Sequence, residues 1–343
     1  MKQLLNSLFI LTPDLYLSLD NENVVVNAGD KIAGRFPIHT LENILYFGYK
    51  DASPALMGEC AERGVNLGFF KPSGRFLGRV VGASRGNVLL RKQQYRIADD
   101  LSASCKIARN FITGKIFNAR SVVNRCMRDH ALSVDIVKMQ EVSHQLFIAV
   151  KKAKKAEDLE TLRGIEGDAA RQYFSVFNDL ILQNKTAFVF TGRSKRPPLD
   201  RTNAVLSFLY TVLANDCAAA LEGAGLDAYV GFLHRDRLGR SSLALDIMEE
   251  LRHIFADRLV LSLINNRQLS PKHFELQENG AVLLNKNGRQ LVLDEWQSKK
   301  RETITHPFLN EKIPWGMVCH LQALLLARYL RGDLEEYPAF LWK

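Results

Sequence analysis

The sequence lacks the residues that build small crosslinked folds, and it lacks a long unbroken apolar run. Its 343 residues include only five cysteines, none of them in a CxxC pair. An odd number of scattered cysteines argues against a disulfide framework and against a zinc knuckle. The most apolar segment, residues 203–226, is interrupted by Asn215, Asp216 and Glu222. Such groups are costly at membrane depth, so the segment predicts a buried helix and no membrane span.

The N-terminal segment also lacks the features of a secretory signal. Its short apolar run is interrupted by Asn6, Pro13 and Asp14, and no small-residue cleavage site follows. We therefore predict that this segment is a strand and that the protein is cytoplasmic.

What the sequence does have is the composition of a folded, basic protein. Hydrophobic residues make up 47% and charged residues 24%, and the length favours two domains. The net charge of +9 favours a polyanionic partner such as nucleic acid over an anionic membrane surface.

Hydrophobic periodicity divides the chain into two parts. Residues 15–29 and 66–82 have the pattern of β-hairpins, and residues 53–64 that of a short helix. After Val88 the period changes to that of helices. The predicted fold class is α+β, with a β-rich domain over residues 1–87, a mostly α-helical domain over residues 88–343 and a hinge at residues 84–88.

Two further patterns in the helical part can be assigned locally. The basic run at residues 151–155 ends one helix or links two. Residues 281–293 surround Asn287-Gly288, a strong hairpin signal, so a third hairpin is predicted there.

Acidic residues are gathered in GFLHRDRLGRSSLALDIMEELR, residues 231–252. His234 precedes Asp246 by twelve positions, and Glu249 and Glu250 follow on the same predicted helix. Spacings of three and four residues place Asp246 on a shared face with each glutamate. Ser241 or Ser242 is available as the helix cap. The alternative interpretation is a solvated acidic face with an incidental histidine.

A second acid, Glu166, lies between Gly164 and Gly167 in a helical pattern. Because glycine costs a helix interior about 1 kcal/mol, these glycines suggest the close approach of a backbone or a ligand. The alternative is a surface glutamate beside a packing contact. One imidazole with two or three carboxylates suits Mg²⁺ or Mn²⁺ better than zinc.

Basic residues in the loop after His234 and in a third segment, residues 191–210, could contact phosphates. The candidate DNA-binding residues are Arg193, Lys195, Arg196, Arg235, Arg237 and Arg240. The alternatives are a solvated loop after His234 and, in residues 191–210, a capped helix start. In that second case Asp200 or Thr202 is the cap and Asn203 orients the backbone.

Three motifs in this order resemble a known family, the CRISPR-associated integrases of the adaptation step, the first of the Cas proteins. The motifs are GIEGDAARQYF, SKRPPLDRTNAVLSFLYT and the acidic segment above. The N-terminal half resembles the family through PIHTLENILYFG and ALMGECAERGVNLGFF, and the opening segment and length resemble its subtype I-C branch.

The resemblance implies a set of site residues. Glu166, His234 and Glu249 are the implied ligands of Mg²⁺ or Mn²⁺, and Asp246 is the other acid of the catalytic set. Many relatives have aspartate where this chain has Glu249. The family assigns no role to Glu250, and we expect it at the surface.

The resemblance also implies the reaction and the partners. The N-terminal domain would form a homodimer, and the protein would insert short DNA fragments into a CRISPR repeat by 3′-hydroxyl attack on phosphodiesters, with DNA endonuclease activity. Implied partners are double-stranded DNA, as fragment and as CRISPR repeat, and the second Cas protein of the adaptation complex. Tyr337, Phe340 and Trp342 either dock that protein or strap the core.

Two other classes of function stay open on the residues alone. One is a structure-specific nuclease acting on branched DNA, which would use water as the nucleophile at the same metal site. The other is a nucleic-acid-binding scaffold without chemistry of its own.

Overall fold

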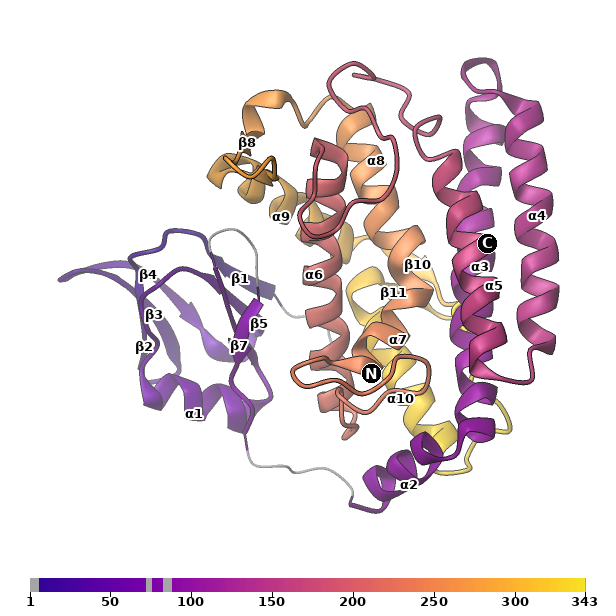
Figure 1. The fold of residues 1–343 in the computed structure, drawn as a ribbon. Coiled ribbons are helices and arrows are strands. Elements are labelled where there is room, and N and C mark those ends of the chain that lie inside the picture. The colour runs from indigo at the N-terminus through magenta and orange to yellow at the C-terminus, as the bar shows by residue number, and fades with distance from the viewer. Residues whose placement is uncertain (1–5, 72–75, 83–87, 343) are drawn as a thin grey trace.

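The computed structural model describes residues 6–71, 76–82 and 88–342. A small strand-rich part lies beside a larger part that is mostly helical (Figure 1). This arrangement confirms the predicted α+β fold class. The predicted hinge at residues 84–88 lies, apart from Val88, outside the described residues.

The strand-rich part contains two sheets. The first is an antiparallel sheet in the order β2 (Tyr16–Asp20), β3 (Asn23–Ala28) and β4 (Lys31–Pro37). The second has the order β1 (Asn6–Ile10), β5 (Leu41–Phe47), β6 (Asn66–Phe70) and β7 (Phe76–Arg79), and only its β6–β7 pair is antiparallel. The opening strand and the two N-terminal hairpins are therefore confirmed. The turn of the second hairpin, at residues 72–75, lies outside the described residues.

The predicted short helix is α1 (Pro54–Arg63). The hydroxyl of Ser53 accepts a hydrogen bond from the Leu56 N–H at 3.2 Å, and Gly64 ends the helix with φ of 69°. A left-handed residue at this position favours glycine because it has no Cβ. Leu56 and Cys60 are buried in the core that α1 shares with the strands.

The helical part consists of nine helices within the described residues and two short strand pairs. The helices are α2 (Val88–Asp99), α3 (Leu101–Asp129), α4 (Ile136–Lys155), α5 (Leu159–Ser175), α6 (Arg201–Gly223), α7 (Ser242–Leu251), α8 (Arg258–Asn265), α9 (Lys286–Arg301) and α10 (Val318–Leu330). The strand pairs are β8 (Phe274–Leu276) with β9 (Val282–Leu284), and β10 (Thr303–Thr305) with β11 (Lys312–Pro314). The basic run at residues 151–155 is the end of α4, as predicted.

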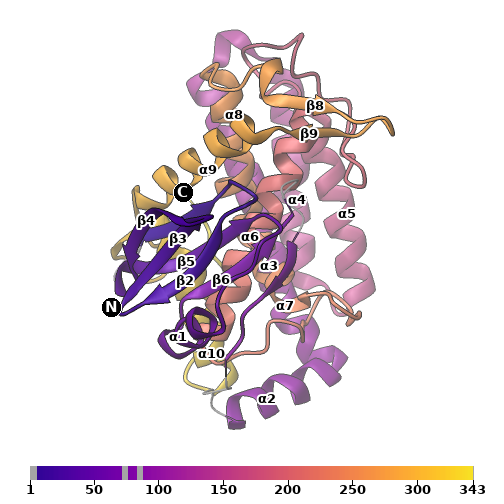
Figure 2. The ribbon, with the colours of Figure 1, turned by 90° about the vertical axis from the view of Figure 1, so that its left-hand side faces the viewer.

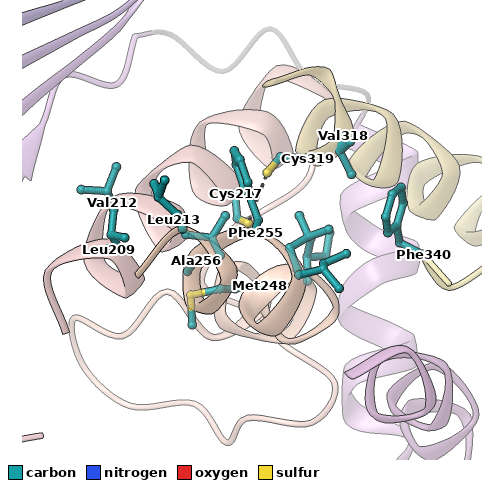
Figure 3. Close-up of a cluster of buried hydrophobic side chains, with 14 of the residues drawn as sticks. Leu209, Val212, Leu213, Cys217, Met248, Phe255, Ala256, Val318, Cys319 and Phe340 are labelled. Carbon is teal, nitrogen blue, oxygen red and sulfur yellow. Dashed lines mark hydrogen bonds between the residues drawn. The ribbon is translucent and has the colours of Figure 1, made fainter. Parts of the chain in front are cut away.

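Helix α6 runs through the middle of the helical core. Figure 3 shows Leu213 and Cys217 of α6 with Phe255 and with Cys319 of α10. The Cys217 and Cys319 sulfurs are 3.7 Å apart, and all five cysteines are free thiols. By length and composition α6 could cross a membrane, but 67% of its most apolar window is buried inside the protein. It is therefore the predicted core helix.

Aromatic side chains join the two parts of the molecule. Phe47 of β5 stacks on Phe70 of β6 with ring centroids 4.8 Å apart, and it lies 6.2 Å from the ring of Phe208 in α6. Arg79 of β7 forms an ion pair with Glu222 near the end of α6. Figure 2 shows the strand-rich part in front of α6.

The predicted third hairpin, at residues 281–293, is wrong. Strand β9 pairs with β8, and α9 begins at Lys286. The side chain of Asn285 accepts a hydrogen bond from the Gly288 N–H at 2.9 Å, so it caps a helix. A Cβ at Gly288 would lie 2.3 Å from the His273 carbonyl oxygen. The glycine therefore allows a close tertiary contact and does not form a turn.

The prediction that Glu250 lies at the surface is also wrong. Its side chain is fully buried. One carboxylate oxygen accepts a hydrogen bond from the Tyr337 hydroxyl at 2.7 Å, and the other accepts from the Phe340 N–H at 2.6 Å and the Gln322 amide at 2.9 Å.

The C-terminal tail is consequently a strap over the core. Tyr337 and Phe340 are buried, not exposed at the terminus. The Asn118 amide of α3 donates to the Phe340 carbonyl at 2.7 Å and accepts from the Trp342 N–H at 2.8 Å. Of the two roles considered for this tail, these contacts support the strap.

Glu250 should make folding stability depend on pH. Burial raises its pKa to about 8, although hydrogen bonds from Phe340, Tyr337 and Gln322 oppose the shift. A neutral carboxyl therefore persists in the fold while the unfolded chain ionises, so its stabilisation is complete below pH 4.5 and is lost as pH rises through about 8. Glu250→Gln stays neutral, so its stability relative to wild type should improve with rising pH.

Urea unfolding between about pH 5 and pH 8.5 measures this difference. The exposed Glu335→Gln is the matched control and should follow the wild-type profile. Parallel profiles for Glu250→Gln and wild type would contradict the role given to Glu250.

Candidate metal centre

Helix α7 carries three acids into the interior. Asp246 and Glu250 are fully buried and Glu249 is 4% exposed. The alternative of a solvated acidic face is therefore wrong. Ser241 stands at the cap position without a side-chain hydrogen bond. Ser242 instead donates its hydroxyl to the Arg235 carbonyl at 3.2 Å. The side chain of neither serine caps α7, so the predicted serine cap is wrong.

Asp246 holds the loop that carries His234. Its carboxylate accepts hydrogen bonds from the backbone N–H groups of Phe232 at 2.7 Å, Leu233 at 3.0 Å and His234 at 3.0 Å. The His234 Nδ1 lies 2.6 Å from the same carboxylate. A Cβ at Gly231 would lie 2.9 Å from the Asp246 carboxylate, so a glycine is needed there.

This pairing sets the direction of the imidazole. With Nδ1 donating to a buried carboxylate, Nε2 is the nitrogen left to accept a proton or ligate a cation. Asp246 is therefore placed behind His234, as a residue that positions the imidazole.

Glu166 and Glu249 meet through a lysine that the sequence analysis did not select. The Lys115 Nζ of α3 lies 2.7 Å from Glu249 Oε2 and forms an ion pair with Glu166 Oε1 of α5. The Lys115 side chain is only 4% exposed. The sequence did contain a signal for this residue. Lys115 is a charged residue among Phe111, Ile112 and other apolar residues on the inward face of α3.

Arg252 is the second site residue that the sequence analysis missed. Its guanidinium lies 2.8 Å from Glu249 Oε1 and 4.7 Å from the centre of the Tyr210 ring. Burial acts to raise the pKa of Glu249, but Arg252, then Lys115 and His234, lower it to about 2. Glu249 is therefore a carboxylate at neutral pH.

The predicted ligands suit a divalent cation by type and surroundings. Among the described residues no three His, Cys, Asp or Glu side chains converge as a complete metal cluster. Glu249 Oε2, however, is buried and lies 2.7 Å from the Lys115 ammonium, so this oxygen already has a cation as its partner. Carboxylate oxygens beside one imidazole are the donors that Mg²⁺ and Mn²⁺ use. The residues thus fit such an ion, with Lys115 as the cation between the two glutamates.

No segment of the chain packs closely against the two glycines beside Glu166. No atom lies within 4 Å of a Cβ placed at Gly164 or Gly167. The expected approach of a protein backbone is therefore wrong, and the space beside Glu166 is open. Glu166 itself is partly exposed.

Arg193 anchors its loop to helix α6. Its guanidinium donates to the Asn203 side chain at 2.6 Å and to the Ser207 hydroxyl at 3.1 Å. Asn203 also accepts from the Ser194 N–H at 3.1 Å, so it orients the backbone as predicted. Asp200 caps α6 by accepting from the Asn203 N–H at 2.7 Å, which confirms one of the two predicted caps.

The other candidate DNA-binding residues lie nearer the surface. Lys195, Arg196, Arg235 and Arg237 are exposed, and Arg240 is half-buried. Arg235 forms an ion pair with Glu160. A cavity of about 510 Å³ adjoins His234 between its loop and the starts of α3 and α5.

Solved structures with this architecture define the class of protein. A casposase bound to integration product has a TM-score of 0.84 and 21% identity, covering 99% of this chain and 95% of that one. A Cas1 protein of Thermotoga maritima has a TM-score of 0.82 and 22% identity, covering 95% and 97%. A Cas6-RT-Cas1–Cas2 complex has a TM-score of 0.81 and 23% identity, covering 100% of this chain and 36% of that one. The fold is that of Cas1.

Sequence comparison gives the family. The model of CRISPR associated protein Cas1 matches residues 8–298. The chain is 46% identical to a CRISPR-associated endonuclease Cas1 of Chlorobaculum tepidum over 343 residues, with full coverage of both. It is 47% identical to another of Rhodospirillum rubrum over 347 residues, again with full coverage. The chain belongs to the Cas1 family.

Removing the charge of Asp246 should loosen the His234 loop. In Asp246→Asn the side-chain NH₂ would face backbone N–H donors, so buried donors would lose their acceptor. The expected loss of stability is about 2–5 kcal/mol. Thermal unfolding measures it, and faster amide exchange at residues 232–234 locates it.

The matched control is Asp236→Asn, an exposed aspartate in the same loop. It should change neither stability nor exchange. Equal behaviour of the two variants would contradict the assignment of Asp246 as the anchor of the loop.

Proposed function

We propose that this Cas1 protein is a metal-dependent DNA integrase of CRISPR adaptation. It joins the 3′-hydroxyl end of a short DNA fragment to a phosphodiester of the repeat, and it also has endonuclease activity. The observation that carries the proposal is the pair of carboxylates, Glu166 and Glu249, which meet at Lys115, with His234 near enough to help lower the pKa of Glu249.

Each site residue has a part in this reaction. Glu166, Glu249 and the Nε2 of His234 would hold Mg²⁺ or Mn²⁺. When bound, the ion would acidify the attacking hydroxyl and neutralise charge on the phosphoryl oxygens. Asp246 keeps the proton on Nδ1 of His234, so that Nε2 stays available. Arg252 fixes Glu249 from the opposite oxygen and keeps it ionised.

The exposed cations supply binding to the DNA backbone. Lys195, Arg196, Arg235, Arg237 and Arg240 would contact phosphates, which carry no sequence information by themselves. The inward hydrogen bonds of Arg193 support a different role for that residue, which is to hold the loop in place.

The proposal includes the assembly. Residues 1–87 would form the homodimer and residues 88–343 the catalytic domain, which would act with the second Cas protein on double-stranded fragment and repeat DNA. The casposase neighbour bound to integration product and the neighbour in a Cas1–Cas2 complex support these partners. The subtype I-C assignment rests on the opening segment and the chain length.

Substitution of the proposed ligands should abolish strand transfer. Glu166→Gln and His234→Ala should each reduce joining of a labelled fragment to a repeat by roughly a hundredfold or more, because metal activation is lost. Binding of the same DNA should stay close to wild type. The measurement is a half-site integration assay in Mn²⁺, with the small partner protein present.

The products of that assay separate the three classes of function. Joined strands support integration, whereas shortened strands alone would support a nuclease acting on branched DNA. Strand transfer that persists in both variants, or in excess chelator, would refute the metal-dependent integrase. DNA binding with neither joined nor shortened strands would support the nucleic-acid-binding scaffold.

Exposed cations should set the salt dependence of DNA binding. Each phosphate contact contributes about 0.9 to the slope of log K against log salt concentration. Lys195→Ala, Arg196→Ala and Arg237→Ala should each lower the slope by roughly that amount. Fluorescence anisotropy with a labelled duplex measures it. The exposed Lys312→Ala of β11 is the control, and a slope equal to wild type in all three variants would exclude these residues from the interface.

A further inference from the structure

Lys115 has a charge that the proposed reaction does not use. Its side chain is 4% exposed and enters the site from α3, a helix whose neighbouring inward residues are apolar. Burial of an ammonium group is costly unless it is paired. The partners are Glu166 Oε1 and Glu249 Oε2, the two proposed metal ligands that bear charge.

The two glutamates come from different helices and need a cation between them. Glu166 belongs to α5 and Glu249 to α7. Two carboxylates that share a site repel each other, and without a neighbouring cation one of them would take up a proton or move away. Arg252 contacts only Oε1 of Glu249, so the oxygen that faces Glu166 is paired with Lys115.

We propose that Lys115 is an internal cation that holds Glu166 and Glu249 together in the metal-free protein and competes with the divalent ion for the same two carboxylates. The inference rests on the proposed function, because it requires that the metal binds to these carboxylates.

Electrostatics makes the two cations mutually exclusive at these oxygens. An ammonium and a divalent ion on the same carboxylates would repel each other strongly at short distance in a poorly solvated site. The lysine side chain is long and flexible, so its ammonium can leave without a change in the backbone. Metal binding therefore includes the loss of the Lys115 ion pairs, and Lys115 weakens the affinity of the site for metal.

A second buried lysine provides a matched control. The side chains of Lys300 in α9 and of Lys115 are each 4% exposed, and Lys300 pairs with Asp216 at 3.3 Å, away from the three proposed ligands. Its substitution also removes a buried ammonium, so it reports what that loss alone does to the fold.

The experiment is a calorimetric titration of Mn²⁺ into the full-length, DNA-free protein. Lys115→Met should bind Mn²⁺ more tightly than wild type, by roughly tenfold, because the competing charge is gone. Its Tm in chelator should fall, and the rise in Tm on adding Mn²⁺ should exceed that of wild type. Lys300→Met should show the wild-type affinity for Mn²⁺, whatever its Tm.

The outcomes separate this inference from the proposed function. Mn²⁺ binding by Lys115→Met that is equal to wild type or weaker overturns the competition. A wild type that binds no Mn²⁺, or a Glu166→Gln variant that binds it as wild type does, overturns the metal site itself and the inference with it.

A further measurement applies if Lys115→Met does not fold. Lys115→Gln then replaces it, with the same expectation of tighter binding. A crystal structure of the wild type with Mn²⁺ gives the independent answer. A Lys115 Nζ withdrawn from the carboxylates supports the competition, and a Nζ still in contact with both beside the ion overturns it.

Discussion

The burial of three carboxylates on the ten-residue helix α7 is the constraint on which the rest of the structure depends. An ionised carboxylate is unstable in an apolar interior unless donors or cations replace its water. The protein meets this need in three ways. Asp246 accepts backbone N–H groups, Glu249 is surrounded by cations, and Glu250 has its pKa raised to about 8.

Each of these ways attaches a different segment of the chain to α7. The backbone donors for Asp246 come from the loop that carries His234, and the cation Lys115 comes from α3 and brings Glu166 of α5 with it. The donors for Glu250 come from α10 and the C-terminal strap. The site and the packing of the helical part are therefore one network, and a change in any of these carboxylates acts on both.

Where a pattern is local, the sequence predicted it well. The strands β1, β2, β3, β6 and β7, the helix α1, the buried helix α6 and the caps at Gly64 and Asp200 follow from residue types within a few positions of each other. The hairpin predicted around Gly288 is wrong because the same residues are compatible with a hairpin turn and with the start of a helix. Asn285 caps a helix, and the contact that needs Gly288 comes from His273, twelve residues before the cap.

The sequence by itself determined the fold class, because hydrophobic period is a property of neighbouring residues. The order of its motifs, through their resemblance to the family, selected Glu166, His234, Asp246 and Glu249 as site candidates. Only the tertiary structure decided what surrounds these acids. Lys115, 51 residues before Glu166, and Tyr337, 87 residues after Glu250, reach the same helix through packing. Whether an acid is solvated, paired or protonated depends on such distant partners, and spacing along the chain does not encode them.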